Sequence, residues 1–301
     1  MNKIKQVAIQ GGAGSNHEIA AKAFFNTEKL EMVPCQTFEE LFETIKKDNT
    51  IYGIMAIENT LVGSILKNYT LLKDSGLVII GEYKLRIKHQ LLALPGQKIE
   101  DITEVHSHPM ALAQCEEFLK KHPHIKMIAS DDTAFSAEWV QKNQLKGIAA
   151  IAPELAAKHY SLEILARDIE TNKRNFTRFL IISDKGKTEV EDLLVKNQVN
   201  KSSLVFSLPH SEGSLSQVLS ILAFYNINLT KIQSLPVVGH EWEYLFYIDL
   251  VFDDYNRYLQ SLDAIRPLIS KLKVLGEYHV GKRSYDTIGN DNRPLSEQKT
   301  F

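Results

Sequence analysis

Short apolar runs alternate with stretches of helical periodicity through the first half of this chain. Apolar runs at residues 7 to 10, 31 to 33 and 52 to 57 are separated by a helical stretch at about 17 to 25 and by another that begins after Thr37. Strands joined through helices pair in parallel, because the helix carries the chain back across the face of the sheet. The pattern therefore predicts an α/β protein built on a mainly parallel sheet.

The same pattern predicts two lobes. A strand-like stretch at residues 77 to 94 leaves the first sheet, and residues 105 to 152 supply a second set of strands and helices. An apolar strand at residues 177 to 183 then returns to the first lobe. Two α/β lobes joined by crossing strands are typical of a periplasmic-binding-protein-like architecture, in which the ligand lies in the cleft between the lobes. We therefore expect residues 5 to 183 to form a bilobal domain.

The rest of the chain is organised differently. Residues 184 to 201 are polar and charged, and we predict that they form a linker. Residues 202 to 281 have the order βαββαβ of a ferredoxin-like domain. The polar residues 282 to 301 are expected to be a tail.

Composition narrows the possible partners and locations. The chain has 301 residues, 44% of them hydrophobic, and a formal net charge of -2. That charge gives no general attraction to nucleic acid or to an anionic membrane, and no stretch approaches the ~20 apolar residues of a membrane span. The chain opens without the apolar segment of a signal peptide, and Cys35 and Cys115 lie in apolar surroundings that suit buried thiols. A cytoplasmic protein is expected.

No metal and no cofactor are expected. His106 and His108 form one closely spaced pair and His122 and His124 form another, but neither pair has a carboxylate or cysteine at the spacing of a metal ligand. A dinucleotide fingerprint would need a glycine where His17 stands.

A glycine-rich turn at residues 11 to 14 precedes the first helical stretch. Ser15 follows it at the helix start, so free backbone amides and the positive helix end would point towards an anion. The alternative is a turn that only allows tight passage from strand to helix.

Polar side chains cluster at two strand ends. Glu58, Asn59 and Thr60 follow the third apolar run, at the edge where α/β sheets usually bind ligands. Thr177 and Arg178 open the strand that closes the first lobe. A guanidinium suits a carboxylate, and a threonine hydroxyl is a neutral donor. The alternative is a strand edge with a threonine of high β-propensity and a solvated arginine.

Five short motifs make the sequence resemble prephenate dehydratase, a bilobal catalytic domain followed by an ACT regulatory domain. The resemblance extends over about residues 5 to 280, and the motifs occur in the family order. They are Gly11 to Glu18, Glu58-Asn59-Thr60 with Gly63-Ser64, Ser107-His108-Pro109 with Gln114-Cys115, Thr133-Ala134 with Ser136-Ala137, and Asn175-Phe176-Thr177-Arg178-Phe179.

The resemblance implies loss of water and carbon dioxide from prephenate, which gives phenylpyruvate in phenylalanine biosynthesis. It implies that Thr177 is catalytic, and we expect Arg178 and the turn at Ser15 to hold the pyruvyl carboxylate, although exchanging the two carboxylate sites would also suit the residues. Arogenate dehydratase and a non-catalytic sensor of a small anion are the alternatives. The residues expected to bind substrate are Ser15, Asn59, Thr60, Ser107, Gln114, Asn175, Arg178 and Phe179.

The C-terminal domain is expected to pair with another copy and to bind phenylalanine. Because a ferredoxin-like sheet leaves edge strands unpaired, we predict a homodimer or homotetramer through these domains. Gln233 and Leu235 stand where phenylalanine-sensitive members carry glutamate and arginine, so a domain that only dimerises is the alternative. The expected effector-binding residues are Gly213, Ser214, Leu215, Asn228, Gln233, Ser234 and Pro236.

Overall fold

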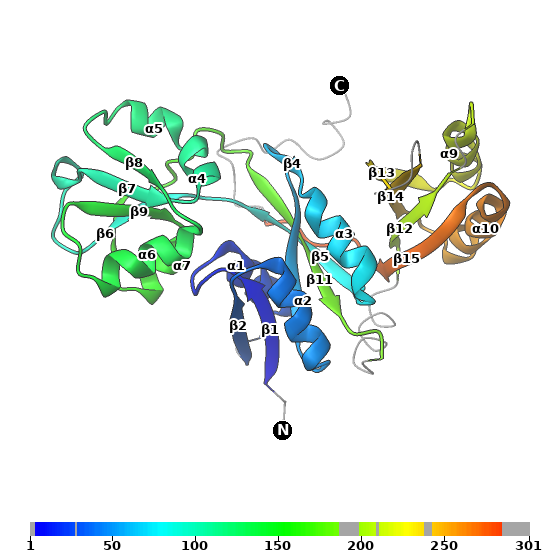
Figure 1. The fold of residues 1–301 in the computed structure, drawn as a ribbon, viewed down its shortest axis with the longest axis horizontal. Coiled ribbons are helices and arrows are strands. Elements are labelled where there is room, and N and C mark those ends of the chain that lie inside the picture. Colours follow the sequence, from blue (N-terminus) through cyan, green and yellow to red (C-terminus); the bar gives the residue numbers. More distant parts are fainter. Residues whose placement is uncertain (1–3, 28, 187–198, 209–210, 238–242, 285–301) are drawn as a thin grey trace.

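The computed structural model describes residues 4 to 27, 29 to 186, 199 to 208, 211 to 237 and 243 to 284. Three units, each built on its own sheet, lie along the long axis of the molecule (Figure 1). The first lobe lies in the centre, with the second lobe on one side and the C-terminal unit on the other. The expected bilobal α/β fold with a ferredoxin-like unit after it is confirmed.

The first lobe contains a mixed sheet. Its elements are β1 (Lys5–Gln10), α1 (Asn16–Phe25), β2 (Leu30–Cys35), α2 (Phe38–Lys47), β3 (Tyr52–Asn59), β4 (Gly63–Ser64), α3 (Leu66–Ser75), β5 (Val78–Arg86) and β11 (Phe176–Ser183). The strand order is β2-β1-β3-β11-β5, with β4 paired to β3. β1 is parallel to β2 and β3, as the alternation of strands and helices predicts. β11 inserts antiparallel between β3 and β5, so a strand from late in the chain completes this lobe.

The second lobe is a smaller α/β unit reached and left through two crossing segments. Its elements are β6 (Gln90–Ala93), a 3-10 turn (Ile99–Asp101), β7 (Glu104–Ser107), α4 (Pro109–Gln114), α5 (Glu116–Lys120), β8 (Lys126–Ala129), α6 (Thr133–Lys142), β9 (Ile148–Ala152), α7 (Glu154–His159) and β10 (Glu163–Ala166). The strand order is β10-β6-β9-β7-β8. Cys115 separates α4 from α5, because its backbone leaves helical geometry with ψ 16°.

The C-terminal unit has the predicted βαββαβ order. Its elements are β12 (Lys201–Ser207), α9 (Ser214–Phe224), β13 (Asn228–Pro236), β14 (Tyr244–Val251), α10 (Tyr255–Ile265), a 3-10 turn (Arg266–Leu268) and β15 (Ser270–Tyr278). The antiparallel sheet has the order β13-β14-β12-β15. The two helices lie on the side of the sheet that faces away from the first lobe (Figure 1).

The free face of that sheet packs on the first lobe. Val205 and Tyr247 belong to one hydrophobic cluster with Ile57, Tyr69 and Leu180 of the first lobe. The two units therefore share a core, which burial of apolar surface stabilises.

The first residues of the expected tail are part of the fold. The Lys84 amide donates to the Lys282 carbonyl at 3.1 Å, and the Ser284 amide donates to the Lys84 carbonyl at 2.9 Å. These residues therefore add to the edge of β5. The remainder of the expected tail and most of the expected linker lie outside the described residues.

Candidate active site

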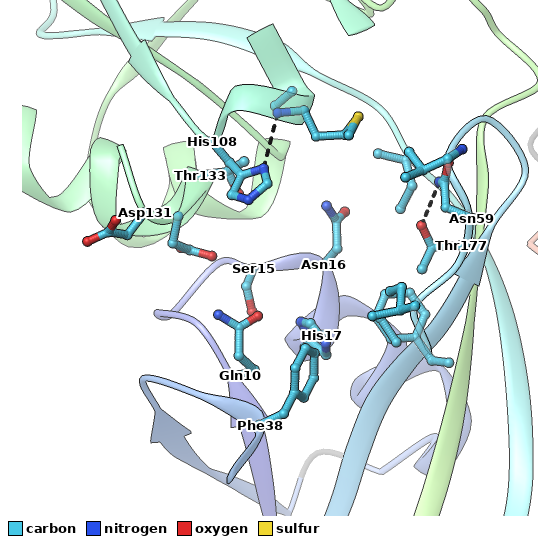
Figure 2. A pocket seen from close by; sticks show the side chains of 18 of the residues that line it. Gln10, Ser15, Asn16, His17, Phe38, Asn59, His108, Asp131, Thr133 and Thr177 are labelled. Atoms are coloured by element: carbon cyan, nitrogen blue, oxygen red, sulfur yellow. Dashed lines mark hydrogen bonds between the residues drawn. The ribbon is translucent and has the colours of Figure 1, made fainter. Parts of the chain in front are cut away.

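A cavity of about 530 Å³ opens between the two lobes. Figure 2 shows Asn59 and Thr177 of the first lobe on one side of it, and His108 and Thr133 of the second lobe on the other. A cavity of this size and position suits a small ligand held between two lobes.

Asn59 and Thr177 lie side by side because β3 and β11 pair these two residues. Asn59 Nδ2 donates to Thr177 Oγ1 at 3.0 Å (Figure 2). Asn59 Oδ1 accepts from the backbone amides of Leu61 and Val62 at 2.9 and 3.2 Å, which fixes the orientation of the amide. Thr177 Oγ1 is thus an acceptor towards Asn59, and its own hydrogen is left to donate to a ligand.

A chain of amides continues from Asn59 to the second lobe. Asn59 Nδ2 also donates to Asn175 Oδ1 at 2.7 Å, and Asn175 Nδ2 donates to Gln114 Oε1 at 2.8 Å. His89 Nε2 lies 2.9 Å from the same oxygen of Gln114. Because that oxygen can only accept, His89 carries its hydrogen on Nε2, and the amide nitrogen of Gln114 is available to a ligand in the cavity.

Two histidines that line the cavity are kept neutral by burial. Burial lowers the pKa of His17 to about 3. Its ring packs edge-on against Phe38 and Phe179, with centroids 5.7 and 5.0 Å apart. Burial is also the main cause that lowers the pKa of His89. Neither imidazole therefore brings positive charge to the cavity near neutral pH.

The start of α1 lines the cavity. Ser15 caps this helix, its Oγ accepting from the Glu18 amide at 3.4 Å. The amides of Asn16 and His17 lie in the first turn, where no carbonyl of the helix can accept from them. This end of α1 therefore suits an anion, as the sequence predicts.

The glycine turn before α1 lies where the two lobes approach each other. A Cβ at Gly11 would come within 2.8 Å of Asp132 Oδ2, and a Cβ at Gly14 would overlap the backbone of Ala156. Both glycines have positive φ, 96° and 85°. Close approach of the second lobe is therefore a reason for the glycines, in addition to the passage from strand to helix.

Thr60, Ser107 and Asn175, all expected to bind substrate, do not line the cavity. Thr60 Oγ1 donates to the Arg174 carbonyl at 3.0 Å and accepts from the Phe176 amide at 2.9 Å, so it ties the loop after β3 to β11. Ser107 is fully buried and donates to the Ile151 carbonyl at 2.6 Å. Both hydroxyls therefore have structural partners.

The prediction that Arg178 holds a substrate carboxylate is wrong. Successive side chains of a strand point to opposite faces, so Arg178 lies on the face of the sheet away from Thr177 and the cavity. Arg178 Nε donates to Glu82 Oε2 at 2.6 Å, Nη2 donates to the Tyr278 hydroxyl at 3.0 Å, and Nη1 binds Asp249. The nearby carboxylates hold the pKa of Arg178 well above its usual value despite burial.

Several cavity residues were not found from the sequence. Three of them lie at or just after the end of a strand: Gln10 ends β1, His108 follows β7 and Asp131 follows β8. The carboxyl ends of strands are the usual ligand edge in α/β sheets, so this rule could have found them. Further cavity residues that the sequence did not indicate include Asn16, His17, Phe38, Lys67, His89 and Thr133.

The expected effector-binding residues lie at the start of α9 and along β13. Gly213 precedes α9 with a φ of 75°, and Asn228 and Pro236 are the first and last residues of β13, an edge strand. A site between two copies would need a second chain, so this assignment stays a prediction.

A sequence profile described as prephenate dehydratase matches residues 7–187. This chain belongs to the prephenate dehydratase family. It is 40% identical over 287 residues to arogenate dehydratase/prephenate dehydratase 2, chloroplastic, of Arabidopsis thaliana, with 91% of this chain and 73% of the relative covered. The expected lyase activity in phenylalanine biosynthesis is confirmed by membership of this family.

Solved structures have the same fold. Prephenate dehydratase of Arthrobacter aurescens in complex with L-Phe has a TM-score of 0.79 and 26% identity, with 91% of this chain and 89% of that chain covered. A protein described as GqqA, a novel type of quorum quenching acylase, has a TM-score of 0.82 and 28% identity, with 92% of this chain and 98% of that chain covered. None of the helices in the described ranges is long and apolar enough to cross a membrane.

Proposed function

We propose that the cavity between the lobes binds prephenate and releases phenylpyruvate, water and carbon dioxide. The observation that carries this proposal is the Thr177 hydroxyl, whose oxygen is occupied by Asn59 and whose hydrogen is free to donate into the cavity. The reaction makes an aromatic ring, so the product itself supplies most of the driving force. The protein needs mainly to position the substrate and assist the leaving hydroxyl.

Thr177 donates a hydrogen bond to the hydroxyl of prephenate as that group leaves. The pKa of the Thr177 hydroxyl is too high for Thr177 to end as an alkoxide. The proton that converts the leaving hydroxyl into water must therefore be replaced on Thr177 from a neighbouring group or a water molecule. Asn59 cannot accept the proton of Thr177, because its nitrogen faces the threonine oxygen. The arrangement therefore suits donation to a leaving group rather than activation of Thr177 as a nucleophile, which would need an adjacent base.

The ring carboxylate lies against the apolar wall formed by Phe38, Phe179 and Ile87. Poor solvation there favours loss of the charge as carbon dioxide. The pyruvyl carboxylate lies at the start of α1 or beside Lys67, which lines the cavity and also pairs with Glu39. If the ring and pyruvyl carboxylates exchanged places, the same protein donors would still bind one of them.

Arogenate is the second candidate substrate, because the Arabidopsis relative is named as an arogenate and prephenate dehydratase. The purified protein is incubated with prephenate and phenylpyruvate is measured by its absorbance in alkali, with arogenate and phenylalanine formation followed in parallel. Turnover of prephenate supports the proposal. Turnover of arogenate alone would mean that arogenate, and not prephenate, is the substrate. Binding without turnover would indicate a small-anion sensor.

We further propose that phenylalanine is the effector of the C-terminal unit and that the protein works in the cytoplasm. The structural neighbour from Arthrobacter aurescens is described in complex with L-Phe. Both cysteines, Cys35 and Cys115, are free and buried, which agrees with a reducing compartment. Inhibition by phenylalanine in the prephenate assay tests the effector.

A further inference from the structure

The two residues that meet in the cavity each have a neighbour that faces the C-terminal unit. Register pairs Thr177 with Asn59 and Arg178 with Glu58, at the ends of β11 and β3. Because side chains alternate along a strand, Thr177 and Asn59 line the cavity while Arg178 and Glu58 project from the opposite face. Adjacent residues of each strand therefore face the cavity and the interface with the C-terminal unit.

Arg178 is bound by both units. Its side chain is 5% exposed, and it donates to Glu82 of the first lobe and to Asp249 and Tyr278 of the C-terminal unit. Ser203 Oγ donates to the other oxygen of Asp249 at 2.5 Å and lies 2.7 Å from the Tyr278 hydroxyl. The guanidinium is thus held in one position by the hydrogen bonds that it donates to Asp249 of β14 and Tyr278 of β15.

Glu58 is bound by the C-terminal unit as well. Lys231 of β13 pairs with Glu58 Oε2, and its ammonium donates to Ser64 Oγ of β4 at 2.9 Å. Arg178 Nη1 lies 3.4 Å from Glu58 Oε1, which links the two anchored residues to each other.

The charges of this interface are complementary. The first lobe contributes one cation and two anions, Arg178, Glu58 and Glu82. The C-terminal unit contributes two cations and one anion, Lys201, Lys231 and Asp249. Each unit alone would carry an unbalanced charge here, whereas together the six groups are neutral and paired. Such a network holds its members in one geometry, since removing one partner takes away part of the charge compensation of groups that are largely buried.

The backbone between these residues is irregular, so side-chain anchors matter for its position. The pairing of β11 with β3 shifts register between Arg178 and Phe179, which leaves Ile57 without a partner across the ladder. A bulge bends the strand and interrupts the regular hydrogen bonds beside the Thr177 pair. The ion-pair network lies on the face of the sheet opposite the cavity, where it supports the bent segment of β11 and β3.

We propose that the C-terminal unit supports the catalytic site directly, with Lys231 and Asp249 as positioning residues that act through Glu58 and Arg178 on Asn59 and Thr177. The inference rests on the proposed function. A shift of the C-terminal sheet relative to the first lobe would change the place of the Thr177 hydroxyl, and small misplacements of a reacting group lower turnover strongly.

The test compares kcat and KM for Lys231→Met, Asp249→Asn and a matched control, Lys273→Met, in the full-length protein. Lys273 also joins the two units, through the Lys73 carbonyl of α3, but the structure records no contact of its ammonium with β3 or β11. We expect the first two variants to lose roughly tenfold in kcat per folded enzyme with KM within about twofold, Lys231→Arg to retain most of the kcat, and Lys273→Met to match wild type.

A second arm separates positioning from general destabilisation. Lys231→Met is combined with Thr177→Ala, and each sample is normalised to the folded fraction by circular dichroism. If Lys231 acts through Thr177, it should add little further loss of kcat in the Thr177→Ala background. The same fold-loss in both backgrounds, or a Lys231→Met enzyme as active as wild type, would overturn the inference. A wild-type protein that turns over neither prephenate nor arogenate would instead overturn the proposed function.

Discussion

At the scale of single residues, the Thr177 hydroxyl is the group on which the proposed chemistry depends. Thr177→Val keeps the shape of the side chain and removes the donor, so we expect kcat to fall by about 10²-fold or more. Thr177→Ser restores a hydroxyl and should keep much of the activity. Steady-state kinetics with prephenate measures this, and a valine variant within threefold of wild type would exclude Thr177 from the mechanism.

His17 makes stability depend on pH. Its pKa is about 3 in the folded protein and near 6.5 when unfolded, so the unfolded state binds more protons between these values. The stabilisation is complete above about pH 6.5 and is lost as pH falls towards 3.

Glu82 contributes to stability at lower pH. The pKa of its carboxyl is about 2 in the folded protein, so its contribution to stability is complete above about pH 4.5 and is lost as pH falls below that value.

His17→Leu should therefore flatten the decrease of Tm between about pH 7 and pH 5. His89, whose pKa is also lowered by burial, should account for part of the decrease that remains. Thermal unfolding followed by circular dichroism at several pH values measures the effect. An equal decrease of Tm in variant and wild type would show that His17 becomes protonated without cost in the folded state.

At the scale of elements, the glycine turn before α1 is constrained by a second element, α7 of the other lobe. A Cβ at Gly14 would overlap Ala156, and its φ is 85°. Gly14→Ala should therefore push the lobes apart, destabilise the protein by about 1–3 kcal/mol and lower kcat.

Gly76→Ala is the matched control for this change. Gly76 ends α3 with a similar φ of 82°, but nothing lies within 4 Å of its added Cβ. Gly76→Ala should therefore lose stability only through the strain of alanine at positive φ. Denaturant unfolding and kinetics measure both variants, and equal losses would mean that contact between the lobes contributes nothing at Gly14.

At the scale of the whole molecule, β13 is an edge strand that can pair with a second copy. We expect a homodimer or a pair of dimers, so sedimentation at micromolar concentration should give a mass well above the 34.1 kDa of one chain. A single-chain mass would leave the edge strand unpaired and would contradict the prediction.

Phenylalanine should bind between two C-terminal units and inhibit turnover, because backbone groups near Gly213 and Asn228 can hold an amino acid even though Gln233 and Leu235 replace the usual charged pair. Calorimetric titration, with tyrosine and tryptophan as controls, measures this. No heat and no inhibition at millimolar phenylalanine would leave the unit with a role in assembly alone.

The sequence by itself determined the α/β class, the two lobes, the βαββαβ unit and the polar motifs that contain Asn59 and Thr177, because these follow from periodicity and from residues beside strand ends. The pairing of Asn59 with Thr177 came from the register of β3 with β11. It could not determine to which face of the sheet Arg178 points or which residues bind its side chain, since Asp249 and Tyr278 lie more than seventy residues away along the chain. Nor could it distinguish the cavity role of Gln114 from the structural roles of Ser107 and Thr60. Only the tertiary structure decided these points, because the face of a strand and the burial of a charge depend on which distant elements pack against it.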